Sequence, residues 1–270
     1  MPSYVVTGAS RGLGYAIVQQ LTKNSDNFVI GIVRNRKSVL PGLEGKKNLH
    51  IIEADITDRI AIEHAAEEVA KLTGGTLNTL INNAALSSQD RAGYQLDTYP
   101  EHEKDLLEKD LLENFRVNVV GVVHTINAFL PLVRAAAAAS GSAKVVTLNT
   151  GVADIEFTVK GELALSPSYA ISKTALLMAV AKYSITYKKE GIIFFSISPG
   201  LVNTATKPPT PEDLQMFATF AKGFKKASPN WDGNPITPEE SAQKVLSVVE
   251  GLTSKDNGAF LSHHGNKEWL

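Results

Sequence analysis

The sequence predicts an α/β protein built on a doubly wound parallel sheet. Short runs rich in β-branched residues alternate with longer segments of helical periodicity. A glycine-rich turn joins the first run directly to a helical segment. Because strands that alternate with helices pair in parallel, one open sheet with helices on both faces would organise the chain. The predicted strands are, in order, Tyr4–Thr7, Phe28–Val33, Leu49–Glu53, Leu77–Ile81, Lys144–Leu148, Ile192–Ile197 and Ala259–Leu261.

The composition fits a single folded domain over residues 1–270. Hydrophobic residues make up 43% of the chain and charged residues 20%, which is typical of a folded protein with a large core. No apolar run approaches the length of a membrane span, and the first predicted strand is not preceded by a basic segment and an apolar signal region. We therefore expect a cytoplasmic protein without a membrane partner.

The net charge and the cysteine and histidine content argue against nucleic acid and metal ions as partners. The formal net charge of −1 gives no electrostatic basis for binding nucleic acid. The chain has no cysteine, which excludes disulfides, thiolate catalysis and cysteine-based metal sites. The six histidines form no recognisable ligand pattern, so we expect no metal.

The central helical region begins with a doubled pentamer, Lys104–Glu108 and Lys109–Glu113, which we interpret as one amphipathic helix. This helix is expected to place Asn118 on a largely apolar, buried face. A buried amide needs hydrogen-bond partners inside the protein, since burying it without them is unfavourable. The residues predicted to share this face are Leu107, Leu111, Phe115, Asn118 and Val122.

Three stretches interrupt the alternation of strands and helices. Leu86–Glu103 and Gly151–Pro167 are predicted to be loops at the carboxyl edge of the sheet, where folds of this class bind ligands. Asn203–Gly233 is the third, and it carries several prolines and Trp231.

The segment from Thr7 to Gly14, Thr-Gly-Ala-Ser-Arg-Gly-Leu-Gly, has the features of a dinucleotide-binding loop. Glycines at positions 8, 12 and 14 allow a sharp turn, a close approach to phosphates and tight packing of the helix on the sheet. The helix N-terminus that follows offers free N–H groups to a pyrophosphate. Taken alone, the segment could also be an ordinary turn between a strand and a helix.

A second motif, Tyr169-Ala-Ile-Ser-Lys173, places a tyrosine and a lysine on one face of a later helix. Together with the glycine-rich loop, Asn82-Asn83-Ala84-Ala85, Asn118 and Pro199-Gly200, in this order, it resembles the short-chain dehydrogenase/reductase family over almost the whole chain. The resemblance is to the branch that contains C-factor proteins, sniffer-type carbonyl reductases and fungal ketoreductases. It implies a Rossmann-type sheet of seven strands in the order 3-2-1-4-5-6-7.

The resemblance also implies a catalytic group of Tyr169, Lys173, Asn118 and Thr150. Tyr169 would act as the acid/base, and Lys173 would lower its pKa and hold the nicotinamide ribose. Asn118 would hold a water connected to the lysine. Thr150 stands where relatives commonly carry serine, and we assign it the role of hydrogen-bonding the substrate oxygen, although Asn149 or Ser168 could substitute or Thr150 could merely end a strand.

Cofactor choice depends on the residues after the second strand. The segment Ile32–Lys37 contains no acid and three bases, and with Arg11 it favours NADP through contacts between Arg34 and the extra phosphate. A solvated basic loop is the alternative interpretation. From the glycine-rich loop and the resemblance together, the expected cofactor-binding residues are Gly8, Ser10, Arg11, Gly12, Leu13, Gly14, Arg34, Asp55, Ile56, Asn83, Ala84, Ala85, Tyr169, Lys173, Pro199, Gly200, Val202 and Thr204.

These residues predict an NADPH-dependent enzyme that reduces a ketone or aldehyde. The substrate is expected to be medium-sized and fairly apolar, such as an intermediate of fungal-type secondary metabolism, and the resemblance implies that a lid at about 203–233 covers it. Non-redox isomerisation or cyclisation and a non-catalytic cofactor sensor are the alternatives. The alanine- and leucine-rich helices at Asn118–Ala139 and Ser168–Lys189 exceed what one sheet face can cover, and in relatives they form a dimer contact, so we expect a homodimer or homotetramer.

Overall fold

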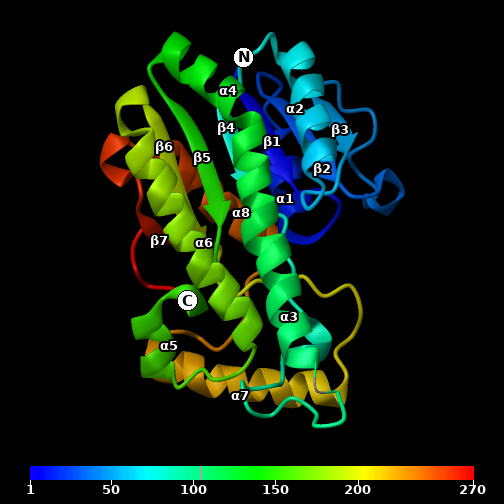
Figure 1. Ribbon diagram of the computed structural model, residues 1–270, viewed down its shortest axis with the longest axis vertical. Helices are drawn as coiled ribbons and strands as arrows, with labels where there is room; N and C mark the ends of the chain where they lie inside the picture. Colours follow the sequence, from blue (N-terminus) through cyan, green and yellow to red (C-terminus); the bar gives the residue numbers. More distant parts are fainter. Residues whose placement is uncertain (104) are drawn as a thin grey trace.

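A computed structural model describes residues 1–103 and 105–270. One parallel sheet of seven strands, in the order β3-β2-β1-β4-β5-β6-β7, runs through the molecule (Figure 1). The predicted doubly wound architecture and strand order are therefore confirmed. The strands are β1 Ser3–Thr7, β2 Phe28–Val33, β3 Leu49–Glu53, β4 Thr79–Asn82, β5 Ala143–Leu148, β6 Ile192–Ser198 and β7 Phe260–Ser262.

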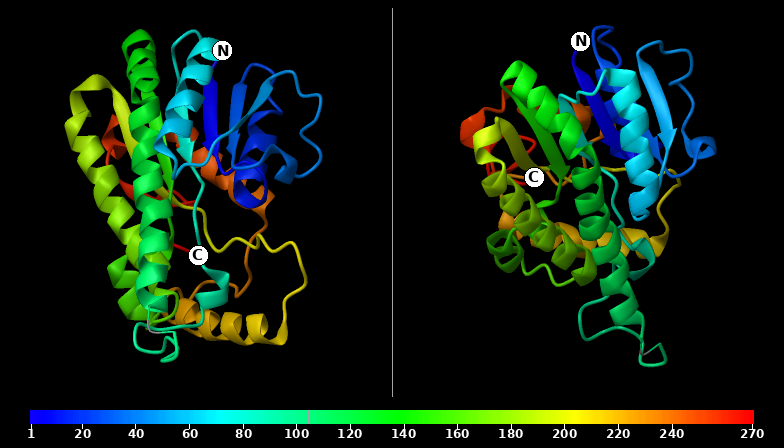
Figure 2. Two further views of the ribbon diagram at one scale, coloured as in Figure 1. Left: turned by 45° about the vertical axis from the view of Figure 1, so that its right-hand side comes forward. Right: turned by 45° about the horizontal axis from the view of Figure 1, so that its top comes forward.

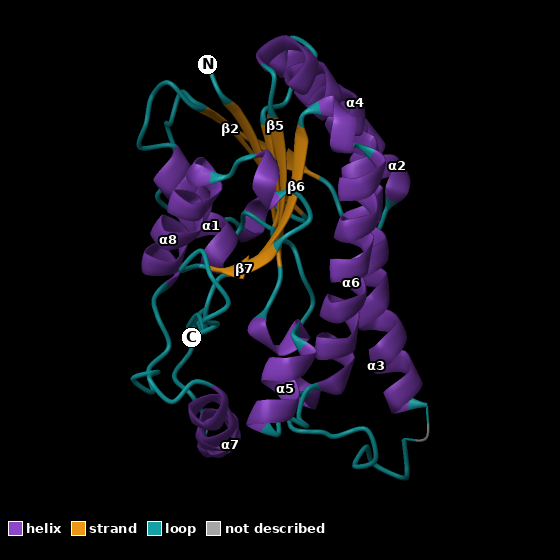
Figure 3. Ribbon diagram, turned by 90° about the vertical axis from the view of Figure 1, so that its left-hand side faces the viewer, coloured by secondary structure: helices purple, strands orange, loops and turns teal. Residues whose placement is uncertain are grey.

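Helices cover both faces of the sheet (Figure 3). α1 and α8 pack on one face, and α2, α4 and α6 pack on the other. Alternate residues along each strand enter the two cores, as Val145 and Val146 of β5 do, because successive side chains of a strand point to opposite faces. The α-helices are α1 Gly12–Leu21, α2 Arg59–Thr73, α3 Leu106–Phe115, α4 Val122–Ser140, α5 Ile155–Gly161, α6 Pro167–Thr186, α7 Pro211–Ala227 and α8 Pro238–Gly251.

The segment Gly151–Pro167 is not the loop that the sequence predicted. It contains a 3-10 turn over Gly151–Ala153 and the helix α5. Asp154 starts α5 by accepting a hydrogen bond from the backbone N–H of Phe157 at 2.9 Å. The helix is short and rich in β-branched residues, which have lower helix propensity, so packing of Phe157 against α7 decides its conformation.

α3 and α4 form one continuous helix, joined by a π-helical stretch over Arg116–Gly121. The predicted apolar stripe is only partly correct, because Phe115 is 44% exposed. Polar residues occupy the buried face instead, at positions 110, 114 and 118. Lys104, the first residue of the predicted helix, lies outside the described residues.

Sequence analysis found no run long enough to span a membrane, but the continuous helix Leu106–Ser140 is long and apolar enough to do so by length and composition alone. Its most apolar window has a mean hydropathy of 1.5 and is 56% buried inside the molecule. Its buried residues pack in the core beside the sheet, together with α2 and α6. The apolar character of this helix therefore has an explanation in the core of the domain.

A third core lies beyond the carboxyl edge of the sheet, where α5 and α7 pack together (Figure 2). Phe157, Phe224, Trp231 and Trp269 form its buried centre. α7 belongs to the predicted lid segment, whereas Trp269 comes from the last residues of the chain. The segment predicted to be the lid is thus anchored to α5 and to the C-terminal segment by aromatic side chains.

Candidate active site

The glycine-rich loop connects β1 to α1 at the carboxyl edge of the sheet, as the sequence predicted. Gly8 and Gly12 have φ angles of +69° and +58°, a region that other residues rarely adopt. Space is equally restrictive, since a Cβ on Gly14 would lie 2.3 Å from the carbonyl oxygen of Gly8. The backbone conformation at Gly8 and Gly12 and the lack of space at Gly14 therefore require glycine at these three positions.

α1 begins at Gly12, within this loop, and Arg11 before it is exposed. Arg11 occupies the N-cap position without a capping side chain, and the first turn contains no acidic residue. Thr204, from the segment after β6, lies over the turn, because a Cβ on Gly12 would come within 3.3 Å of its Cγ2. The positive end of the helix dipole, with no acidic residue in the first turn, fits a pyrophosphate group.

Asn83 ties the glycine-rich loop to the end of β4. Its Nδ2 donates to the carbonyl oxygens of Thr7 and Gly8 at 2.9 and 3.3 Å. In return, the Thr7 hydroxyl accepts from the backbone N–H groups of Asn83 and Ala84, both at 3.0 Å. The two neighbouring strand ends are thereby held in a fixed relation.

Tyr169 and Lys173 lie one turn apart on α6, as expected from their spacing. The Lys173 ammonium is 5.9 Å from the centre of the Tyr169 ring and donates to the carbonyl oxygen of Leu148 at 3.0 Å. Lys173 is only 3% exposed, and this burial lowers its pKa to about 8.

The pKa of Tyr169 departs from the sequence expectation. The lysine, together with the positive nicotinamide of the oxidised cofactor, was expected to lower it, but in the chain alone burial raises the pKa of Tyr169 to about 12. Desolvation of the phenolate therefore outweighs the attraction of an ammonium almost 6 Å from the ring centre. The phenol is protonated at neutral pH and is suited to donate a proton.

Among the three hydroxyl or amide candidates near β5 and α6, the hydroxyl of Thr150 donates no hydrogen bond within the described residues, whereas Asn149 and Ser168 are in contact with other side chains or backbone groups. Thr150 Oγ1 accepts a long hydrogen bond from the Val152 N–H at 3.4 Å. Asn149 donates to the carbonyl oxygen of Lys173 at 3.1 Å and accepts from Thr150, while Ser168 contacts Tyr99. The structure thus directs Asn149 and Ser168 to other partners.

Asn118 is completely buried in the π-helical stretch and is fully hydrogen-bonded, as its predicted position requires. It exchanges two hydrogen bonds with the backbone of Leu86, at 2.7 and 2.9 Å. Its Nδ2 also donates to Ser172 Oγ at 2.9 Å, and Ser172 donates to the carbonyl oxygen of Tyr169 at 2.8 Å. The π-helical stretch is therefore connected to the residues around Tyr169.

The remaining predicted residues follow strand ends at the same edge. Arg34 is exposed after β2, and Asp55 after β3 accepts from the N–H and hydroxyl of Thr57, both at 2.8 Å. Ile56 packs against Gly121, where a Cβ would meet its side chain at 3.0 Å. Those at or near the strand ends are Ser10, Arg11, Leu13, Ala84 and Ala85 beside β1 and β4, and Pro199, Gly200, Val202 and Thr204 after β6.

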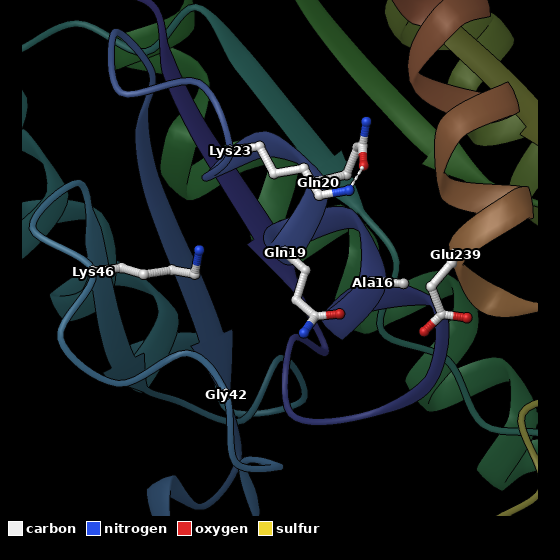
Figure 4. A pocket seen from close by; sticks show the side chains of 7 residues that line it. All are labelled: Ala16, Gln19, Gln20, Lys23, Gly42, Lys46 and Glu239. Atoms are coloured by element: carbon white, nitrogen blue, oxygen red, sulfur yellow. Dashed lines mark hydrogen bonds between the residues drawn. The ribbon is translucent and has the colours of Figure 1, made fainter.

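Two hollows elsewhere on the surface contain none of these residues. One, of about 160 Å³, lies beside α1 and is lined by Gln19, Lys23 and Lys46, with Glu239 of α8 at its border (Figure 4). The other, of about 670 Å³, lies along α7 beside Trp231. No group of three or more metal-ligating side chains occurs among the described residues; the absence of a metal site stays a prediction.

Two residues that the sequence did not single out, Ser172 and Asp110, contribute to the arrangement, and Asn149 has a role other than the one considered for it. Asn149 holds the backbone of Lys173, Ser172 holds that of Tyr169, and buried Asp110 lies behind Asn118 on the same helical face. Spacing of four between positions 110, 114 and 118 was the available signal. It was overlooked because the leucines beside these polar residues indicated an apolar stripe.

Comparisons with known proteins agree with this geometry. The family model described as "short chain dehydrogenase" matches residues 3–215. The chain is 43% identical to "Short chain dehydrogenase virK" of Hypocrea virens and 41% identical to "Short-chain dehydrogenase/reductase AacuF" of Aspergillus aculeatus, with 100% of each chain covered.

Solved structures show the same fold. An NADPH-bound carbonyl reductase from chicken fatty liver has a TM-score of 0.75 and 27% identity over 98% of both chains. The carbonyl reductase Sniffer of D. melanogaster has a TM-score of 0.79 and 23% identity over 98% of both chains. The strand order, the glycine-rich loop, the tyrosine–lysine pair and these matches together show that the chain belongs to the short-chain dehydrogenase family of oxidoreductases.

Proposed function

We propose that this protein reduces a ketone or aldehyde to an alcohol with NADPH. The observation that carries the proposal is the pair of Tyr169, which is partly buried, and Lys173, which is buried, one turn apart on α6 at the same sheet edge as the glycine-rich loop. A carbonyl reduction requires a proton donor for the developing alkoxide. Tyr169, whose pKa is raised to about 12 by burial, keeps that proton at neutral pH.

In the proposed reduction, Tyr169, Thr150 and Lys173 would each have a separate role. NADPH, when bound, supplies a hydride to the carbonyl carbon. The Tyr169 hydroxyl donates its proton to the carbonyl oxygen, and the Thr150 hydroxyl donates a hydrogen bond to the same oxygen. The carbonyl oxygen of Leu148 holds Lys173, which binds the cofactor ribose and stabilises the phenolate left after proton transfer.

Preference for NADPH rests on Arg34 and Arg11. Arg34 is exposed directly after β2, and Arg11 stands at the N-cap position of α1. Guanidinium groups pair well with a phosphate, and neither arginine forms a salt bridge among the described residues. The NADPH bound to the chicken carbonyl reductase supports the same choice.

The proposed substrate is medium-sized and fairly apolar, and the lid segment with α7 would cover it. Support comes from the aromatic core that joins α5, α7 and the C-terminal residues beyond the sheet edge. The similar proteins from fungi favour an intermediate of fungal-type secondary metabolism as the substrate. A cytoplasmic location belongs to the proposal and fits a domain whose apolar residues pack mainly against its own sheet.

The test is a screen of ketones and aldehydes that follows NADPH absorbance, with NADH in parallel. Tyr169→Phe serves as the matched inactive control. We expect turnover with NADPH for at least one apolar carbonyl compound and none with the variant. Cofactor binding without turnover would favour a sensor, and conversion of a reactive intermediate without NADPH consumption would favour isomerisation or cyclisation.

Self-association is a further part of the proposal. Ile171, Met178 and Ile185 are 46%, 62% and 70% exposed and recur every seven residues along α6. A period of seven places them on one face of the helix, where they would be covered in a homodimer or homotetramer. Light scattering at micromolar concentration should give at least twice the mass of the chain, and Met178→Glu should shift it toward the monomer. A strict monomer would contradict the proposal.

A further inference from the structure

A buried polar cluster lies between α3 and the segment Leu86–Glu103. At its centre is the carboxylate of Asp110, which is 3% exposed. Asp110 Oδ1 accepts from Ser88 Oγ at 2.7 Å and from Arg91 Nη1 at 2.9 Å, and Oδ2 accepts from Tyr99 Oη at 2.7 Å. Burial opposes ionisation, but these hydrogen bonds and the charge of Arg91 outweigh it and lower the pKa of Asp110. An ionised carboxylate thus anchors three side chains of one segment.

That segment is also bound to the start of α6. The carbonyl oxygen of Tyr94 accepts from the Ser166 N–H at 3.1 Å, and the Tyr99 hydroxyl lies 3.3 Å from Ser168 Oγ. Ser166 has a φ of +57°, which is strained for a residue other than glycine and persists only when its surroundings hold it. Contacts from this segment therefore fix the backbone just before Tyr169.

A second branch leaves Asp110 along the helix. Asn114 Nδ2 donates to Asp110 Oδ1 and to Ser88 Oγ, both at 3.1 Å. Asn118 lies one turn further, with its Nδ2 3.4 Å from Asn114 Oδ1, and it donates to Ser172 at 2.9 Å. The two branches end at Ser168 and Ser172, on either side of Tyr169 in the same helix.

We propose that Asp110 is a positioning residue for Tyr169, acting through Tyr99 on one side and through Asn114 and Asn118 on the other. In this role Asp110 also holds the segment Leu86–Glu103 in place beside the reacting groups. The inference rests on the proposed reduction. Positioning matters for the rate, because a displacement of about 1 Å at a proton donor can lower turnover on the order of a hundredfold.

The variants Asp110→Asn and Tyr99→Phe test this role at two different points of the cluster. Tyr99→Phe leaves the pair of Asp110 and Arg91 intact, so the chain can fold even if Asp110→Asn destabilises it. Glu113→Gln is the matched control, because Glu113 also accepts from Arg91, at 3.1 Å, but forms no hydrogen bond with the other members of the cluster. We expect kcat to fall about tenfold to a hundredfold in the first two variants, with the Kd for NADPH within about twofold of wild type. The control should retain wild-type kcat.

Hydrogen exchange supplies a readout that does not need the reaction. Amides of residues 166–173 should exchange faster in Asp110→Asn and Tyr99→Phe, while those of β1 and β4 and of the control variant stay unchanged. A wild-type protein that reduces no carbonyl compound would refute the proposed function, and the exchange data would still decide the positioning role. Unchanged exchange at 166–173, a uniform rise across the sheet, or kcat within twofold of wild type in both variants would overturn the inference.

Discussion

The two halves of the carboxyl edge that we propose bind the cofactor and the substrate, the cofactor side and the substrate side, are built in different ways. Around α1, the backbone forms the site, with glycines at positive φ and Asn83 bonded to main-chain oxygens. Beyond α6, side chains form it, through the aromatic core of α5 and α7 and the polar cluster around Asp110. A backbone-built site restricts residue types strictly, whereas a side-chain-built site can vary with its substrate.

The largest expected effect lies on the substrate side, at Tyr169. Tyr169→Phe should lower kcat about a thousandfold, because the ring remains and only the proton donor is lost. The Kd for NADPH, measured by fluorescence titration, should stay within about twofold of wild type. Near-wild-type turnover would show that another group supplies the proton.

The next effect tests the backbone-built side. Gly14→Ala should weaken NADPH and NADH binding equally, on the order of a hundredfold, because the new Cβ would lie 2.3 Å from both Gly8 O and Asn83 Nδ2 and would displace the loop. Gly251→Ala is the control, since a Cβ there meets no atom within 4 Å. Binding titrations that show equal affinities for the two variants would contradict the role of the loop.

The sequence predicted the strand order and the glycine-rich turn well for the same physical reason. The strand order and the turn at Gly8 and Gly12 follow from local residue types, because periodicity and glycine report backbone conformation directly. The helix α5 and the exposure of Phe115 could not be predicted in this way. Both depend on packing between residues distant in the sequence, as in the contact of Phe157 with Phe224.

The raised pKa of Tyr169 belongs to the same class of unpredictable properties. The spacing of Tyr169 and Lys173 indicated a favourable charge interaction but contained no information on how deeply either group is buried. Likewise, the roles of Asn149 and Asp110 depend on which strand and loop the fold brings against α6. Such properties follow from tertiary structure, and only the presence of the residues can be read from the sequence.

Lys173 is proposed to act on both the cofactor and Tyr169. Its replacement should lower activity but raise stability. Burial lowers its pKa from 10.5 to about 8, so at pH 7 the folded protein holds a charge that the unfolded chain holds more favourably. Lys173→Met should raise the free energy of unfolding at pH 7 by about 3–4 kcal/mol at most, since each pKa unit corresponds to roughly 1.4 kcal/mol. Turnover should fall at least tenfold.

The burial of Lys173 also determines how the stability of the protein depends on pH. Between pH 8 and 10 the unfolded wild-type chain binds more protons than the folded protein, so Lys173 makes stability rise with pH in this window. Tyr169 acts in the opposite direction above pH 10, because its folded pKa is raised to about 12. Thermal unfolding scans across pH 7–10 should show the rise in wild type and a smaller one in Lys173→Met. Parallel curves would contradict the burial of a charged lysine.

The smallest effect concerns an exposed side chain on the otherwise backbone-built cofactor side. A charge-assisted hydrogen bond between Arg34 and a phosphate contributes about 1.5–3 kcal/mol, so Arg34→Ala should raise the KM for NADPH about tenfold or more. NADH has no phosphate for this arginine to bind and should be little affected; Arg11→Ala should act likewise but less strongly if Arg34 dominates. Lys47→Ala, which removes one exposed positive charge from the next loop, controls for net charge. A wild-type preference for NADH, or equal losses with both cofactors, would show that the basic residues after β2 form only a solvated surface.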